Sequence, residues 1–274
     1  TESIQITDTK KENDLIIHFA EVLPADPSAP VLARVDVVKR IHTEVHHSAT
    51  HLLHAALRTV LGTHVAQKGS LVNEEHLRFD FSHFSKVSDE EVRQIEALVN
   101  EKIREDVEVV IREMSKEEAI DLGAMALFGE KYGDRVRVVI MDPEYSIELC
   151  GGTHVGSTGQ LGLFKIQHES AVAAGIRRIE AVSGKAAMDW IDEQLQTLHE
   201  IKLALKNPKE PLKAIEKIQE EKARVEKHAE MLEARHLVVI RNEVLTKDEI
   251  INQVSFIGDI VEVSSPDALK KLCM

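Results

Sequence analysis

The chain has 274 residues, of which 43% are hydrophobic and 30% are charged, and its formal net charge is −13 at neutral pH. This composition is typical of a soluble globular protein with one or two hydrophobic cores, and the lack of an apolar run of about 18 residues excludes a helical membrane span. The acidic balance argues against general nucleic-acid affinity but permits one local basic patch. Because two cysteines, Cys150 and Cys273, do not make a disulfide framework, a reducing, cytoplasmic location is expected.

The first 41 residues carry strand signals. Segments 3–9, 14–22 and 31–38 alternate or cluster β-branched and apolar residues, which predicts three strands. Since these strands have no partner helix, they indicate part of a β-barrel, and the chain is expected to be a piece of a longer protein. A helix should follow from Thr43 to Leu61 and end at Gly62.

Residues 42–184 mix helices and strands without a regular βαβ alternation, which favours an α+β domain with an antiparallel-type sheet. Capping boxes at Ser88 with Glu91 and at Ser115 with Glu118 predict helices over 88–106 and 115–123. The expected strands are 77–81, 107–111, 135–141, 146–150, 161–167 and 176–182.

The character of the sequence changes near Ser183. Two charged segments, 185–206 and 211–235, predict a long helical hairpin or coiled linker over 185–238 that packs against a neighbouring helix or domain. A strand over 256–263 and a short helix capped by Ser265 would then begin a truncated C-terminal domain over 239–274.

The nine residues "HHSATHLLH", positions 46–54, hold four histidines. On a helix, positions four apart share one face, so His47 and His51 can converge on one ion, with His54 continuing the stripe. His46 points elsewhere and is the weakest candidate. Two histidines alone more often mark a solvated helix face than a metal site.

A second cluster, "ELCGGTHVGSTG", places Cys150 and His154 four apart in a tight loop. Each has an ordinary alternative, as a small buried hydrophobe and as a loop histidine. Together with His47 and His51 they predict a composite Cys and three-His site, whose thiolate and imidazole ligands favour Zn²⁺. Four protein ligands are typical of a structural zinc, and Ser48 stands where a metalloprotease motif has its general-base glutamate.

These stretches, with "VAQKGSLV", "LRFDF", "GAMALFGEKYGDRVRVV", "TGQLGLFKI" and "AAGIRRIEAVSG", resemble the editing domain of the alanyl-tRNA synthetases and the related free-standing alanyl-tRNA deacylases. The resemblance covers roughly residues 40–185. It implies zinc ligands at His47, His51, Cys150 and His154, and an active-site position at Gln67; His46 stands where the family usually has Asn. The helical region favours a fragment of a bacterial synthetase, which attaches alanine to tRNA(Ala) with ATP, over a free-standing deacylase.

The implied reaction is hydrolysis of the aminoacyl ester of Ser-tRNA(Ala) and Gly-tRNA(Ala) at the acceptor end of the tRNA. Gln67 would orient water or substrate through its amide. Thr50 would bond a seryl hydroxyl, unless it bonds back to its own helix, which is the commoner use of a mid-helix threonine.

Three basic residues are candidate tRNA contacts. Arg177 and Arg178 alternate on one strand, so one could meet a phosphate at the tRNA 3′ end while the other is a surface charge. Lys68 lies in "QKGS", a candidate backbone cradle near the same entrance.

Two other classes of protein remain open. One is a zinc-stabilised tRNA-binding module without catalytic activity. The other is an interaction protein that forms a homo-oligomer through its helical or C-terminal region.

Overall fold

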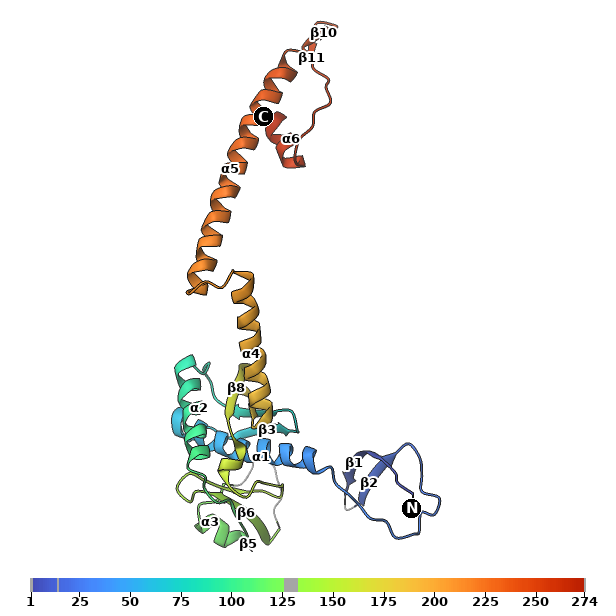
Figure 1. Cartoon of the computed structure of the whole chain (residues 1–274), viewed down its shortest axis with the longest axis vertical. Helices are drawn as coiled ribbons and strands as arrows, with labels where there is room; N and C mark the ends of the chain where they lie inside the picture. The colour runs from blue at the N-terminus through green and yellow to red at the C-terminus, as the bar shows by residue number, and fades with distance from the viewer. Residues whose placement is uncertain (1, 14, 126–132, 274) are drawn as a thin grey trace. The chain divides into compact units, whose positions relative to one another are not determined.

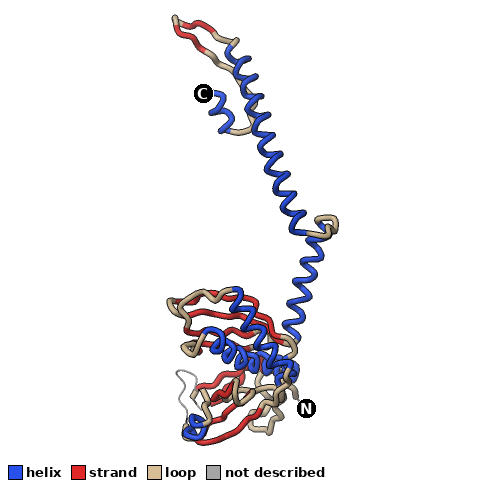
Figure 2. The backbone as a smooth tube through the Cα atoms, turned by 90° about the vertical axis from the view of Figure 1, so that its left-hand side faces the viewer, coloured by secondary structure: helices blue, strands red, loops and turns tan. Residues whose placement is uncertain are grey.

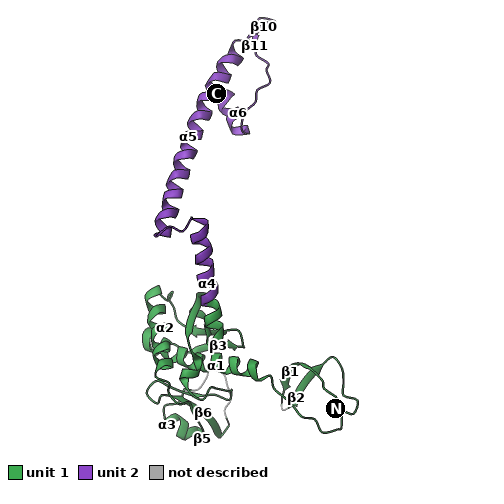
Figure 3. Cartoon of the chain, in the orientation of Figure 1, with its two compact units in different colours: residues 1–190 green, residues 191–274 purple. Residues whose placement is uncertain are grey.

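The computed structural model describes residues 2–13, 15–125 and 133–273, and the chain divides into two compact units, residues 1–190 and 191–274 (Figure 3). The predicted α+β class and antiparallel sheets are confirmed, and the C-terminal part of the chain contains a long helix (Figures 1 and 2). Among the described residues, no helix is both long enough and apolar enough to cross a membrane.

The N-terminal segment forms a two-stranded antiparallel hairpin of β1 (Ile6–Glu12) and β2 (Leu15–Ala20). The described part of this segment contains no closed barrel. The third strand predicted over 31–38 was wrong, because α1 (Val37–Leu61) already begins at Val37. The side chain of Asp36 accepts a hydrogen bond from the Lys39 amide at 3.0 Å and caps the helix there.

A four-stranded antiparallel sheet forms the larger layer of the first unit, in the order β3-β4-β9-β8. Its strands are β3 (Gln67–Val72), β4 (Leu77–Ser82), β8 (Phe164–Ala173) and β9 (Ile176–Ser183). Helices α1 and α2 (Asp89–Arg104) pack on one face of this sheet. The fully buried core between them includes Leu52, Leu53, Leu57, Phe79, Phe81, Ile95, Phe164 and Ile179.

A smaller three-stranded sheet, in the order β5-β6-β7, lies on the other side of α1 (Figure 1). It consists of β5 (Val110–Ser115), β6 (Arg135–Met141) and β7 (Ser146–Leu149), accompanied by the short helix α3 (Lys116–Asp121). The single turn η1 (Thr158–Leu161) follows β7. Both predicted capping boxes are present, at Ser88 with Glu91 and at Ser115 with Glu118. Helix α1 is therefore the element shared by the two sheets.

The second unit holds most of α4 (Lys185–Ala204), then α5 (Pro211–Leu245), the small hairpin of β10 (Glu249–Ile251) and β11 (Val254–Phe256), and α6 (Pro266–Cys273). The two long helices predicted over 185–206 and 211–235 are present as α4 and α5, but they do not pack along one another as a hairpin would, and α5 packs against α6. Leu212, Ile218 and Val225, on the apolar stripe of α5, are exposed. The predicted Ser265 cap is confirmed by its bond to the Ala268 amide at 3.1 Å.

Candidate metal centre

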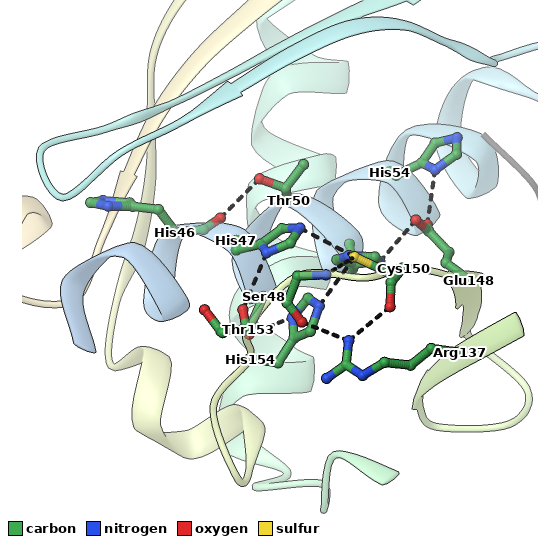
Figure 4. A network of polar contacts seen from close by, with 12 residues as sticks. His46, His47, Ser48, Thr50, His54, Arg137, Glu148, Cys150, Thr153 and His154 are labelled. Atoms are coloured by element: carbon green, nitrogen blue, oxygen red, sulfur yellow. Dashed lines mark hydrogen bonds and ion pairs between the residues drawn. The ribbon is translucent and has the colours of Figure 1, made fainter. Parts of the chain in front are cut away.

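Helix α1 supplies the first half of the site. Its core face carries Ala49, Leu52 and Leu53, all fully buried, which fixes how the helix is turned. His47 and His51 consequently project together from another face, on which both lie near Cys150 and His154; Figure 4 shows His47 beside these two residues. His51 is 4% exposed, while His47 is only partly buried.

The loop that follows β7 supplies the second half. The Arg137 guanidinium of β6 donates hydrogen bonds to the carbonyls of Cys150 at 2.7 Å and Gly152 at 2.6 Å. The backbone N–H of Gly152 in turn points at the Cys150 sulfur, with N and Sγ 3.4 Å apart. These contacts hold the loop in a tight turn that brings Cys150 and His154 to the same point.

The four predicted ligands meet in space. One donor atom from each of His47, His51, Cys150 and His154 lies within 4.8 Å of the others. The Cys150 Sγ is 3.4 Å from Nε2 of His47 and 3.4 Å from Nε2 of His154. Tetrahedral zinc with ordinary Zn–N and Zn–S bonds separates its ligand atoms by about 3.5 Å. The donor set and its spacing therefore fit Zn²⁺.

Each histidine is also held from behind through its Nδ1 atom. His47 Nδ1 lies 3.1 Å from the Thr153 carbonyl, and His154 Nδ1 lies 3.1 Å from the Ser48 hydroxyl. His51 Nδ1 lies 2.8 Å from Oε2 of Glu148, which sits off the ring N–H axis and makes the contact chiefly electrostatic. The hydrogen-bonded partners of His47 and His154 hold Nδ1 of each ring and leave Nε2 for an ion.

The site holds two negative charges in a buried place. Burial opposes the thiolate of Cys150, but hydrogen bonds from His154, His47 and His51 outweigh it and lower the pKa of Cys150 to about 3. Burial likewise opposes the Glu148 carboxylate, yet His51 and His54 hold its pKa well below the usual range. Burial would lower the pKa of His51, but Glu148 and Cys150 raise it to about 10, whereas burial dominates at His154 and lowers its pKa to about 4. The thiolate is thus in the form a metal requires.

The other residues of the histidine cluster point away from this centre. The Thr50 hydroxyl donates to the His46 carbonyl at 2.8 Å, so it does bond back to its own helix, and Thr50 is buried (Figure 4). His46 Nδ1 contacts the Asn73 carbonyl at 2.9 Å. His54 packs against Phe79, with ring centroids 5.1 Å apart and ring planes tilted by 44°.

Gln67 and Lys68 lie at the start of β3, a strand that the sequence did not predict. Gln67 is half-buried and pairs with Phe81, which in turn pairs with Arg177. One row across the sheet therefore runs through Gln67, Phe81 and Arg177. Lys68 is exposed, at an irregularity of the strand pairing between Gln67 and Gly69.

Arg177 and Arg178 each make a two-pronged ion pair within the sheet. Arg177 donates to both oxygens of Glu169 at 2.5 Å. Arg178 donates to the two oxygens of Asp80 at 2.6 and 2.8 Å. A phosphate contact from either arginine would have to share the guanidinium with its carboxylate.

Four contributors to the site went unnoticed in the sequence: Glu148, Ser48, Thr153 and Arg137. Glu148 had a readable signal, because strand alternation places it on the same face as Cys150, two residues on. Ser48 and Thr153 act through contacts between α1 and the loop, and Arg137 acts through contacts between β6 and the loop. No local sequence pattern encodes these contacts.

Part of the chain matches a known domain of aminoacyl-tRNA synthetases. Residues 136–180, which span β6, the Cys150 loop and most of β9, match the model of the second additional domain of threonyl and alanyl tRNA synthetases.

The curated relatives that match over most of the chain are alanine–tRNA ligases. The chain is 51% identical over 270 residues to the alanine–tRNA ligase of Cytophaga hutchinsonii, covering 98% of this chain and 31% of the relative. It is 48% identical over 264 residues to that of Flavobacterium psychrophilum and 49% identical over 257 residues to that of Bacteroides fragilis, covering 30% and 29% of those relatives. Over almost its whole length the chain is therefore similar to a segment of alanine–tRNA ligases, and it spans about three tenths of the length of these curated relatives.

Proposed function

We propose that residues 42–184 form an editing domain that hydrolyses the aminoacyl ester of Ser-tRNA(Ala) and Gly-tRNA(Ala). A synthetic site for alanine distinguishes serine or glycine by one hydroxyl or one methyl group, which limits discrimination to about 1–3 kcal/mol. A second, hydrolytic site then restores accuracy. The observation that carries this proposal is the convergence of His47, His51, Cys150 and His154 in a chain similar to a segment of alanine–tRNA ligases.

The remaining segments would belong to other parts of the whole protein. Residues 1–41 would belong to a β-barrel, 185–238 to a linker, and 239–274 to the start of a C-terminal domain. The whole protein would attach alanine to tRNA(Ala) with ATP in the cytoplasm. Its partner here would be the tRNA acceptor end, and self-association through the helical or C-terminal region stays a prediction that light scattering can check.

Zinc bound at the site would supply Lewis acidity toward the ester or its attacking water. The Nε2 atoms of the three histidines and the thiolate of Cys150 are the groups that would hold it. Because four protein donors complete a tetrahedron, the same set also suits a positioning role, in which these residues fix where the acceptor end sits.

Gln67 and Thr50 are proposed to act on the substrate. The Gln67 amide cannot take a proton at neutral pH, so it would orient water or the ester by hydrogen bonding. The Thr50 hydroxyl donates its proton to the His46 carbonyl, so its oxygen can still accept a hydrogen bond from a seryl hydroxyl. Arg177, Arg178 and Lys68 are proposed contacts for the tRNA 3′ end.

Deacylation of Ser-tRNA(Ala) by the 274-residue chain tests the proposal, with Ala-tRNA(Ala) as the reference substrate. We expect faster hydrolysis of the seryl ester, and loss of that activity in Cys150→Ala and in metal-stripped protein. A chain that binds both Ser-tRNA(Ala) and zinc yet hydrolyses nothing would instead be a zinc-stabilised tRNA-binding module, to which a closed four-donor set is equally suited.

A further inference from the structure

Glu148 is a buried carboxylate that lies directly behind the four-donor cluster. It is 2% exposed, at the third position of β7, and faces α1. Its Oε2 lies 2.8 Å from Nδ1 of His51, and its Oε1 lies 2.9 Å from Nδ1 of His54. A single carboxylate thus joins two histidines that are one turn apart on one helix.

The three histidines of the cluster are backed by different kinds of group. His47 faces a backbone carbonyl and His154 faces a hydroxyl, so both partners are neutral. Among the residues that the structure describes, only His51 of these three is backed by a charge. A carboxylate behind a ligating imidazole makes that imidazole a stronger ligand, and here it acts through its charge, because Oε2 of Glu148 lies off the N–H axis of His51.

Charge balance gives Glu148 a second reason to be there. A zinc ion with one thiolate and three neutral imidazoles carries one net positive charge. Cys150 is 8% exposed and His51 4% exposed, and an unbalanced charge in such a place is costly. The Glu148 carboxylate supplies the missing negative charge at the rim of the ligand shell.

His54 does not belong to the ligand set, but it holds the Glu148 carboxylate next to His51. Its Nδ1 is used by Glu148, its ring packs against Phe79, and its Nε2 has no hydrogen-bond partner among the described residues. His54 therefore anchors Glu148 from the sheet side of α1. The carboxylate cannot swing away from His51 without also breaking this bond.

We propose that Glu148 is a positioning residue of the metal centre: its charge, placed against His51, strengthens that ligand and neutralises the bound ion, and zinc affinity depends on it. The proposal rests on the zinc site described above, and it assigns no contact between Glu148 and the metal or the substrate.

The test is zinc affinity of the 274-residue chain, measured by competition with a chromophoric chelator. Glu148→Gln keeps the shape and removes the charge, and we expect a 10- to 100-fold loss of affinity. Glu148→Asp keeps the charge on a shorter stem and should fall between Glu148→Gln and the unaltered chain. The visible spectrum of the cobalt-loaded protein should keep its tetrahedral bands in both variants, since all four ligands remain.

Asp80→Asn is the matched control, because Asp80 is also a buried carboxylate in an ion pair, with Arg178. It should leave zinc affinity within about threefold of the unaltered chain. Equal zinc affinity in Glu148→Gln and the unaltered chain overturns the proposal, as does an equal loss in Asp80→Asn. If Glu148→Gln does not fold, Glu148→Asp decides: unaltered affinity there overturns the proposal. An unaltered chain that binds no zinc removes the metal centre itself and this proposal with it, whereas tight zinc without deacylation removes only the editing function.

Discussion

Gly152 and His47 approach so closely that no side chain fits between them. A Cβ built on Gly152 would lie 2.0 Å from Cε1 of His47 and 2.6 Å from its Nδ1. Glycine is required at this position by the imidazole it faces, since the backbone of Gly152 is not in the left-handed region.

Replacing Gly152 with Ala should therefore push the His47 ring out of the cluster. We expect at least a tenfold loss of zinc affinity, on the order of a lost orienting contact, measured by chelator competition. Gly151→Ala is the matched control, because a Cβ there meets nothing within 4 Å. Equal affinities in the two variants would contradict this account of the loop.

Removing the metal should lower the melting temperature of the chain. A ligand present at a hundred times its dissociation constant adds about 2.7 kcal/mol, which corresponds to about 5–10 °C for a protein of this size. Scanning calorimetry with and without a chelator measures the difference. Cys150→Ala should show no response to the chelator, while Cys273→Ala, at an exposed cysteine, should respond like the unaltered chain.

Arg137 should stabilise the loop whether or not a metal is bound. It donates charge-assisted hydrogen bonds to two loop carbonyls, so we expect Arg137→Met to cost about 2–3 kcal/mol in urea unfolding of the metal-free protein. Arg135→Met, two residues earlier on the same strand, removes a side chain whose contact to the Glu113 carbonyl is 3.5 Å long. That control should stay within about 0.5 kcal/mol, and a similar loss in both variants would remove the special role of Arg137.

The pair of Asp142 and Lys102 should give a defined dependence of stability on pH. The hydrogen bond from Lys102 at 2.8 Å and the amide of Glu144 lower the pKa of Asp142. Because the pKa of Asp142 is lowered in the folded state, its ionised form stabilises the fold at pH values above its unfolded-state pKa, near 3.9. This stabilisation is lost as the pH falls through the pKa of the folded state. Asp142→Asn should thus be less stable by about 1 kcal/mol at pH 7 and equal to the unaltered chain near pH 2. Urea unfolding at several pH values measures this, and a gap independent of pH would rule the mechanism out.

Thr50 offers a test of substrate selection. Thr50→Val keeps the shape of the side chain and removes its oxygen, so the ratio of Ser-tRNA(Ala) to Ala-tRNA(Ala) hydrolysis should fall about tenfold, as for one lost hydrogen bond. Thr50→Ser keeps the hydroxyl and should preserve the ratio. An unchanged ratio in Thr50→Val would leave Thr50 with only its bond to His46.

Features set by neighbouring residues were predictable from the sequence. The capping boxes of Ser88 and Ser115 placed the starts of α2 and α3, since each box closes within one helical turn. The strand predicted over 31–38 was wrong because Asp36, inside that apolar run, caps the start of α1. Strand β3 was missed because Gly69 and Ser70 carry no strand signal, and it is held by its pairing with β4.

The four clustered donors could be found because they come as two pairs, each with a regular spacing. What lies behind them could not, since Ser48 reaches His154 across 106 residues of chain and His54 reaches Glu148 across 94. The predicted hairpin of helices failed for a related reason. Helical periodicity shows that a face is apolar but does not say what covers it.

The separation between the two halves of the metal centre has a consequence for how the molecule assembles. His47 and Cys150 are 103 residues apart, and closing a loop of that length early in folding is entropically unfavourable. Helix α1 must first settle between its two sheets before the four donors come within reach of one ion. Zinc would then bind to a nearly complete fold. A chain made without metal should therefore form the same core and bind zinc when it is added later.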